Sequence, residues 1–155
     1  MIEIVSLCPD IAQQLCRDIT QDLPQYFGLP QINEHYAIGI SSCTNLVAKI
    51  ATEYVGLIAL NFPYPNNMNI YWLAIFRNFH SQGIGSKLIQ SAYDIAKEKR
   101  ATTMTVETLA ASQADANYLK TYQFYQHNGF YPLFDLKPQN YEFDMVYMIK
   151  NILSN

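Results

Sequence analysis

The sequence predicts a mixed α/β layer fold, in which a central β-sheet is flanked by helices. Apolar runs rich in β-branched and aromatic residues, typical of strands, alternate with segments whose apolar residues recur every three to four positions, typical of helices. In the middle of the chain, the apolar run 70–76 precedes a glycine-containing turn and an amphipathic helix. The 155 residues suit one domain, which we expect to span 1–155.

The N-terminal part predicts one strand and two helices. A short strand is expected over 1–7, ending before Pro9. Apolar residues recur every fourth position over 11–23 and Pro24 follows, which predicts an amphipathic helix that ends there. A second helix is expected over 32–42.

The next part predicts a hairpin and then the central strand. Two apolar, β-branched runs, 44–50 and 55–61, are expected to pair around the turn 51–54. Prolines and asparagines predict a loop over 62–67. The run 68–76 has lost the alternation of a half-buried strand, so we expect it to be buried on both faces and central in the sheet.

The C-terminal half predicts two helices and three strands. One helix begins at Gly83-Ile84-Gly85, and its last turn is cationic, as the helix macrodipole prefers. The other is expected over 115–127, stopped by Gly129. The strands are expected over 102–109, 130–134 and 141–149. The last, with aromatic residues and Met at every second position, is expected as an exposed edge that could pair across a homodimer.

Composition excludes several classes of protein. The formal charge of −3 and the lack of a basic cluster argue against nucleic-acid binding as the main role. The longest apolar run, 70–76, is far shorter than the roughly 18 residues of a membrane span. The three cysteines are an odd number and the start of the chain lacks a secretory pattern, so we expect reduced thiols and a cytoplasmic location.

The turn at Gly83 and Gly85 is the first candidate for chemistry. Free backbone N–H groups at the positive end of a helix can bind a phosphate without a cationic side chain. Tight helix–strand packing around the glycines is the alternative interpretation. The dinucleotide fingerprint fails because Leu88 stands where a third glycine is needed, and the P-loop fails because Ser86 precedes Lys87.

The central strand, the glycine turn and a downstream aromatic segment together resemble a known protein family. The strand 70–75, the turn His80-Ser81-Gln82-Gly83-Ile84-Gly85 and the following Leu88-Ile89 resemble motif A of the GNAT superfamily of N-acetyltransferases, a buried strand, then Gln/Arg-x-x-Gly-x-Gly/Ala and a helix. The segment 124–130, Phe-Tyr-Gln-His-Asn-Gly-Phe, resembles its motif B. The similarity covers most of the chain, with His80 in place of the usual Gln or Arg.

The resemblance implies an acetyl-CoA-dependent transfer on a GNAT-like fold with a mixed, mostly antiparallel sheet. The pantetheine arm would pair with the backbone near Leu73, Ala74 and Ile75, where an N–H would also stabilise the thioester oxyanion. Other cofactor contacts are expected at His80, Asn117 and Tyr125. The pyrophosphate of CoA would rest on the amides of Ser81, Gln82, Gly83, Ile84, Gly85 and Ser86.

Two catalytic roles are expected from the same comparison. Tyr125 matches the family's motif B tyrosine, which protonates the departing thiolate, although a stripe with Tyr118 and Tyr122 could be packing alone. The acceptor arrives largely as an ammonium and needs a base, for which Glu107, on the polar face of its strand, is the first candidate and Glu53 the second.

The sequence therefore predicts an N-acetyltransferase that moves an acetyl group from acetyl-CoA to a primary amine of a small molecule or peptide by direct attack in a ternary complex. One alternative is a non-catalytic module on the same fold that senses acyl-CoA or binds a peptide. Another, a flavodoxin-like nucleotide binder, is opposed by the expected hairpin. No metal is expected, because the histidines lack ligand spacing.

Overall fold

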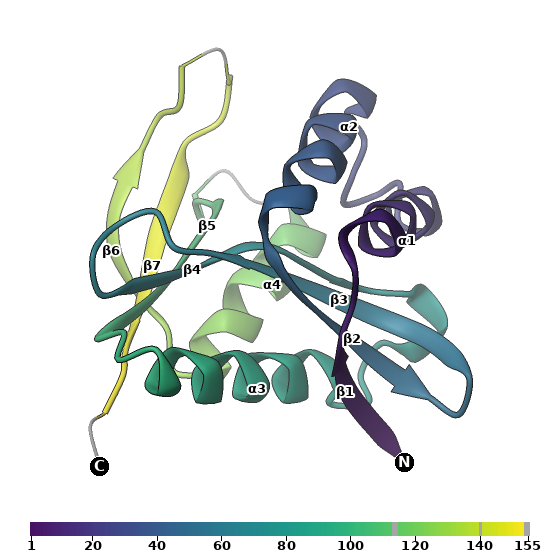
Figure 1. Ribbon diagram of the computed structural model, residues 1–155. Coiled ribbons are helices and arrows are strands. Elements are labelled where there is room, and N and C mark those ends of the chain that lie inside the picture. Colours follow the sequence, from purple (N-terminus) through teal and green to yellow (C-terminus); the bar gives the residue numbers. More distant parts are fainter. Residues whose placement is uncertain (113–114, 140, 154–155) are drawn as a thin grey trace. The chain divides into compact units, whose positions relative to one another are not determined.

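The computed structural model describes residues 1–112, 115–139 and 141–153 (Figure 1). Its helices are α1 (Pro9–Asp22), α2 (Pro30–Gly39), α3 (Ile84–Glu98) and α4 (Ala116–His127), with short 3-10 turns η1 (Ile40–Ser42) and η2 (Arg77–Phe79). Its strands are β1 (Ile2–Ser6), β2 (Thr44–Ile50), β3 (Glu53–Asn61), β4 (Asn67–Ile75), β5 (Thr103–Leu109), β6 (Tyr131–Leu136) and β7 (Met145–Asn151).

The strands follow the order β1-β2-β3-β4-β5-β7-β6. The pairs β1-β2, β2-β3, β5-β7 and β6-β7 are antiparallel, so the sheet is mostly antiparallel. The α/β class is thereby confirmed, and so is the central place of β4. Within the described ranges, no helix is both long and apolar enough to cross a membrane.

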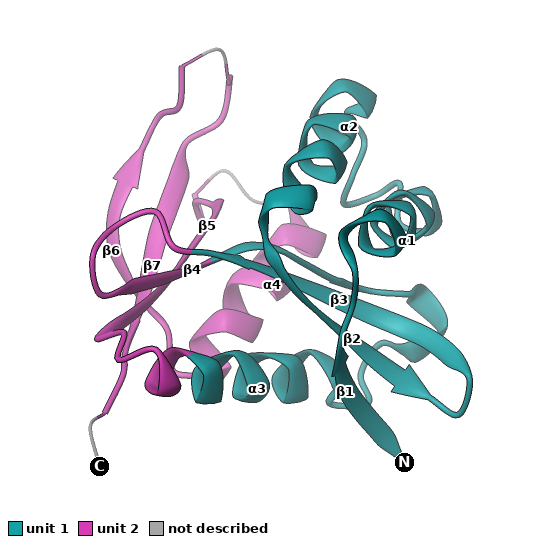
Figure 2. Ribbon diagram, viewed as in Figure 1, with its two compact units in different colours: residues 1–61, 70–95 teal, residues 62–69, 96–155 magenta. Residues whose placement is uncertain are grey.

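The chain forms two compact units, shown in Figure 2. Unit 1 comprises residues 1–61 and 70–95, and unit 2 comprises residues 62–69 and 96–155. Both β4 and α3 contribute residues to each unit. The single domain expected over 1–155 remains a prediction.

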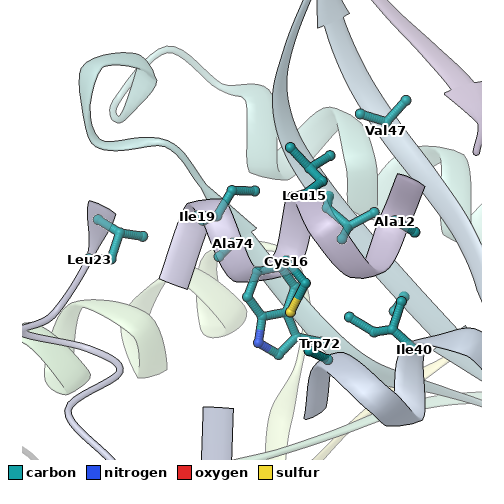
Figure 3. Close-up of a cluster of buried hydrophobic side chains, with 12 residues drawn as sticks. Ala12, Leu15, Cys16, Ile19, Leu23, Ile40, Val47, Trp72 and Ala74 are labelled. Atoms are coloured by element: carbon teal, nitrogen blue, oxygen red, sulfur yellow. The ribbon is translucent and has the colours of Figure 1, made fainter. Parts of the chain in front are cut away.

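The core of unit 1 lies between α1, α2 and one face of strands β2, β3 and β4 (Figures 1 and 3). Leu15 and Ile19 of the predicted series lie on the buried side of α1, whereas Ile11, the first of the series, is 47% exposed. Trp72 of β4 fills the middle of this cluster and stacks on Phe27, with ring centroids 5.6 Å apart. Cys16 is fully buried here, and desolvation raises the pKa of its thiol to about 12.

The expectation that β4 is buried on both faces is wrong. Trp72 and Ala74 are buried in the core cluster, whereas Tyr71, Leu73 and Ile75 between them are only half-buried. The half-buried face also consists of apolar residues, so the sequence of β4 does not show the alternation that is seen in the burial. On this strand Ile75 leans over β3, where the space above Gly56 would not admit a Cβ atom.

The β2-β3 hairpin carries a residue in a conformation that favours glycine. Ile50 pairs with Glu53, so the turn is the two residues Ala51 and Thr52, shorter than expected. Ala51 has a φ of 54°, in the left-handed region. Replacing Ala51 with Gly should therefore raise the free energy of unfolding by about 0.5–1 kcal/mol, after allowing for the greater freedom of glycine in the unfolded chain.

Thermal denaturation of Ala51→Gly tests this, with Ala116→Gly as the control. Ala116 is exposed in the first turn of α4, where glycine has no conformational advantage and should slightly lower stability. Equal Tm changes of the same sign for the two variants would contradict the role given to the positive φ.

In unit 2, β7 lies between β5 and β6 and is antiparallel to both. Helix α4 starts where Asp115 accepts hydrogen bonds from the amides of Asn117 and Tyr118, each 3.0 Å long. It ends at His127, and Gly129, two residues further on, has a φ of 90° that turns the chain into β6. The predicted helix and its glycine stop are confirmed.

Two expectations about the last strand are wrong. It begins at Met145, because residues 141–144 do not join the ladder, and it is not an edge, because both its sides are already paired. It therefore has no free edge for pairing across a dimer. The outer strand is β6, in which Pro132 and the irregular register between Pro132 and Phe134 blunt the edge.

Candidate active site

The turn between β4 and α3 lies within unit 1 and combines two residues of positive φ. Ser81 has a φ of 63° and Gly83 one of 77°. The amide of Lys87 donates to Gly83 O over 3.1 Å, so the helical hydrogen bonds begin at Gly83. The amides of Ile84, Gly85 and Ser86 therefore precede any intrahelical acceptor.

The turn has open space around Gly83. A Cβ atom built on Gly83 would meet no atom within 4 Å, and residues 81–83 are exposed. Ile84, by contrast, is buried and fixes the start of the helix. Backbone amides at the positive end of α3 that have no intrahelical acceptor suit a pyrophosphate such as that of CoA.

His80 fastens the turn to the end of β4. Its Nε2 atom lies 2.7 Å from Ile75 O, and since a carbonyl oxygen only accepts, Nε2 carries the proton. The imidazole also meets Tyr26 edge to face, with centroids 6.5 Å apart. His80 thus connects the turn to the last residue of β4. Nδ1 is the second polar atom of its ring.

One edge of the β4 backbone is hydrogen-bonded to β3, and the second edge is the one on the side away from β3. The amide of Phe76 donates to Val55 O of β3 over 2.9 Å. Alternation along a strand directs the polar groups of Ala74 to that same side and those of Leu73 and Ile75 to the other. Of the three residues expected near the pantetheine arm, Leu73 and Ile75 therefore carry the groups on the second edge.

Arg77, just after β4, anchors the C-terminal end of α1. Its backbone N–H donates to Asp22 Oδ2 over 2.6 Å, and its guanidinium donates to Asp22 O and to Gln25 Oε1 over 2.9 Å each. A cation at a helix C-terminus is also favoured by the macrodipole. The segment that leads into the turn is thereby tied to α1 by side chain and backbone together.

Tyr125 is buried in unit 2, near the C-terminal end of α4. Its ring is 5% exposed and packs edge to face between Phe124 and Phe130, at 5.3 and 5.6 Å between centroids. Burial raises the pKa of the phenol above its ordinary value, so the group keeps its proton. Asn117, also expected at the cofactor, lies about 12 Å away along the axis of α4, in its first turn.

Glu107 on β5 lies directly opposite Tyr147 on β7. The Tyr147 hydroxyl donates a hydrogen bond to the carboxylate, which lowers the pKa of Glu107, but partial burial outweighs it and the pKa is raised overall. Tyr64 also acts electrostatically on Tyr147. Glu53, the second candidate base, is exposed beside the β2-β3 turn, opposite Ile50.

The predicted site residues fall into two groups. Those from Leu73 to Ser86 are in unit 1, while Glu107, Asn117 and Tyr125 are in unit 2. Sequence reasoning missed Tyr147, because only the strand register pairs it with Glu107. In the described part of the chain, no cluster of three or more His, Cys, Asp or Glu side chains could hold a metal ion.

A comparison with known protein families shows which family has these features. A family model described as the acetyltransferase (GNAT) family matches residues 12–130, which include the β4-α3 turn and the segment around Tyr125. The chain belongs to this GNAT family. The predicted resemblance is confirmed, and with it acetyltransferase membership for the chain. No curated protein matches the sequence of this GNAT protein at a significant level.

Solved structures with similar folds are acetyltransferases of distant sequence. An IAA acetyltransferase from Bacillus cereus is 18% identical with a TM-score of 0.71, over 97% of this chain and 99% of that one. The ribosomal-protein-S18-alanine N-acetyltransferase from Escherichia coli is 16% identical with a TM-score of 0.77, over 98% and 94%. An aminoglycoside 6'-N-acetyltransferase complexed with coenzyme A is 16% identical with a TM-score of 0.74, over 99% and 98%. At such identities the similarity shows the GNAT fold.

Proposed function

We propose that this GNAT protein is an N-acetyltransferase that uses acetyl-CoA to acetylate a primary amine of a small molecule or peptide, by direct attack in a ternary complex. The observation that carries the proposal is the open turn at Gly83, which offers backbone amides to a pyrophosphate. We further propose that it acts in the cytoplasm, in keeping with its three free cysteines.

The reaction needs a base and an acid. An acceptor ammonium gives one proton to the Glu107 carboxylate, and the neutral amine attacks the thioester carbonyl. The N–C bond forms and the C–S bond breaks. Tyr125 gives its proton to the departing thiolate, and the second proton of the nitrogen restores the Tyr125 phenol through water, while Glu107 passes its proton to water. The products are an amide and free CoA thiol, with one proton released to water.

Support for these roles comes from the surroundings of each group. The raised pKa of Tyr125 keeps the phenol protonated, as an acid must be before it donates. Glu107 is a carboxylate with a partner that holds it in place, in contrast to Glu53 at its exposed hairpin. The amides of Leu73 and Ile75 are the proposed donors to the developing oxyanion.

The alternative proposal is a GNAT module that retains acyl-CoA without turnover. It is favoured by His80, which stands where the family usually has Gln or Arg. The hydrogen bond from His80 to Ile75 O gives this side chain a structural role at the turn, so the substitution alone does not disfavour catalysis.

The first experiment is calorimetric titration of the purified protein with acetyl-CoA, followed by a thiol-release assay with a panel of primary amines. We expect acetyl-CoA to bind and at least one amine to stimulate thiol release. Binding without release by any amine would favour the non-catalytic module. No binding of acetyl-CoA or CoA would overturn both proposals.

A further inference from the structure

A row of side chains crosses three neighbouring strands of unit 2. Glu107 of β5 pairs with Tyr147 of β7, and Tyr147 pairs in turn with Phe134 of β6. Residues that are direct partners in an antiparallel pair project from the same face of the sheet. The row therefore places a carboxylate at one end and two aromatic rings beside it (strands in Figure 2, magenta).

The members of this row are in contact and accessible. The rings of Tyr147 and Phe134 meet edge to face, with centroids 5.6 Å apart, and the Tyr147 hydroxyl donates to Glu107. Phe134 is 52% exposed, although it is a large apolar side chain. Tyr64, 67% exposed, acts electrostatically on Tyr147.

The charge of the row is negative. Among the described residues, the groups recorded as acting on the Glu107–Tyr147 pair are these two residues and Tyr64, which are acidic or neutral. The Lys99 ammonium lies 5.3 Å from the centroid of the Phe62 ring, and Phe62 is part of the loop that carries Tyr64. A ligand carboxylate held beside Glu107 would therefore meet like charge, whereas an ammonium would meet a carboxylate and aromatic faces.

We propose that the row Glu107–Tyr147–Phe134, together with Tyr64, is the acceptor subsite, and that it selects an arylalkylamine without a carboxylate next to the amine. Tyr147 is the positioning residue that holds the base Glu107. The ammonium lies at Glu107 and the aromatic body lies along the exposed rings. This inference rests on the proposed N-acetyltransferase function.

The spacing of the row suits such an acceptor. Neighbouring strands are about 4.8 Å apart, so Glu107 and the ring of Tyr147 are separated by a distance that a two-carbon linker can span. A ring attached there meets Tyr147 and Phe134, and ring pairing adds about 1 kcal/mol beyond buried area. Both the position of the charge and the apolar surface thus point to the same class of amine.

The substrate test compares phenethylamine with phenylalanine, which differs from it by one α-carboxylate. With acetyl-CoA saturating, we expect kcat/KM for phenethylamine to be about 100-fold higher, because like charges cost several kcal/mol when held together. Butylamine, which keeps the ammonium without the ring, should be about five-fold poorer than phenethylamine. Equal kcat/KM for phenethylamine and phenylalanine would overturn the subsite.

The test of Tyr147 is the pH profile of kcat/KM for Tyr147→Phe. The ring of the Tyr147→Phe variant keeps the burial that raises the pKa of Glu107. The variant lacks the hydroxyl whose hydrogen bond lowers this pKa, so the pKa of Glu107 rises. The acidic limb of the profile should move up by about one pH unit, as expected for the loss of a bond to a charged group. Tyr131→Phe is the control, since Tyr131 is an exposed tyrosine of β6 that contacts Asn151.

The two proposals fail in different ways. A lower rate for Tyr147→Phe with an unmoved acidic limb would mean a merely structural role and would overturn the positioning of Glu107. Acetyl-CoA binding and thiol release with other amines, but not with phenethylamine, would overturn the subsite and leave the N-acetyltransferase standing. If acetyl-CoA does not bind, the proposed function itself is overturned and the subsite with it.

Discussion

Tyr125→Phe should lower kcat about 100-fold or more and weaken acetyl-CoA binding far less. The loss follows from removal of the proton donor to the departing thiolate, since general acid catalysis contributes about 10²–10⁴-fold. The ring stays in place between Phe124 and Phe130, so the packing of α4 is retained. Thiol release under saturating substrates measures kcat, and calorimetry measures the Kd.

Tyr122→Phe is the matched control for this variant. Tyr122 is a half-buried tyrosine of the same helix, less than one turn before Tyr125. Its loss of a hydroxyl should leave kcat near the wild-type value. Unchanged turnover in Tyr125→Phe, or an equal loss in both variants, would remove Tyr125 from the mechanism and return it to a packing role.

Gly83→Glu should weaken acetyl-CoA binding by about 100-fold or more. The added carboxylate would stand at the open turn, where a pyrophosphate would otherwise meet backbone amides, and like charges held together cost several kcal/mol. Calorimetry against acetyl-CoA measures the loss, and thermal denaturation reports whether the variant folds.

The positive φ of Gly83 requires a second variant, Gly83→Ala. Both substitutions carry the strain of a side chain at a φ of 77°, about 1–2 kcal/mol, but only the glutamate adds charge. We expect Gly83→Ala to lower Tm while binding acetyl-CoA far more tightly than Gly83→Glu. Equal affinities for the two would show that strain, rather than an anion site, explains the loss.

Much of the fold can be predicted from local patterns along the sequence. Most of the fourfold apolar series over 11–23 is found in the structure, because Leu15 and Ile19 are buried in the cluster that contains Trp72, while Ile11 is exposed. The glycines at 83 and 129 mark a helix start and a helix stop, and both have positive φ. These are local effects, which a single segment can carry by itself.

Features that depend on partners far along the chain were missed. Aromatic alternation over 141–149 suggested one long strand, but the ladder with β5 begins only at Met145. The pairing of Glu107 with Tyr147, forty residues apart in the chain, depends on this register, which no local pattern specifies. In β4, half-buried Leu73 and buried Ala74 are equally apolar, so composition cannot distinguish the two faces.

The three thiols of unit 1 have a practical consequence for measuring turnover. Assays that trap free CoA with a sulfhydryl reagent also detect reactive cysteines of the enzyme, and the thiolate is the reactive form. Burial raises the pKa of Cys16 to about 12 and that of Cys43 to about 11, whereas Cys8 is exposed. The folded enzyme should contribute a rapid background of about one equivalent, from Cys8. Slower labelling of Cys16 would then report the opening of α1 from its core, so one reagent follows both catalysis and local unfolding.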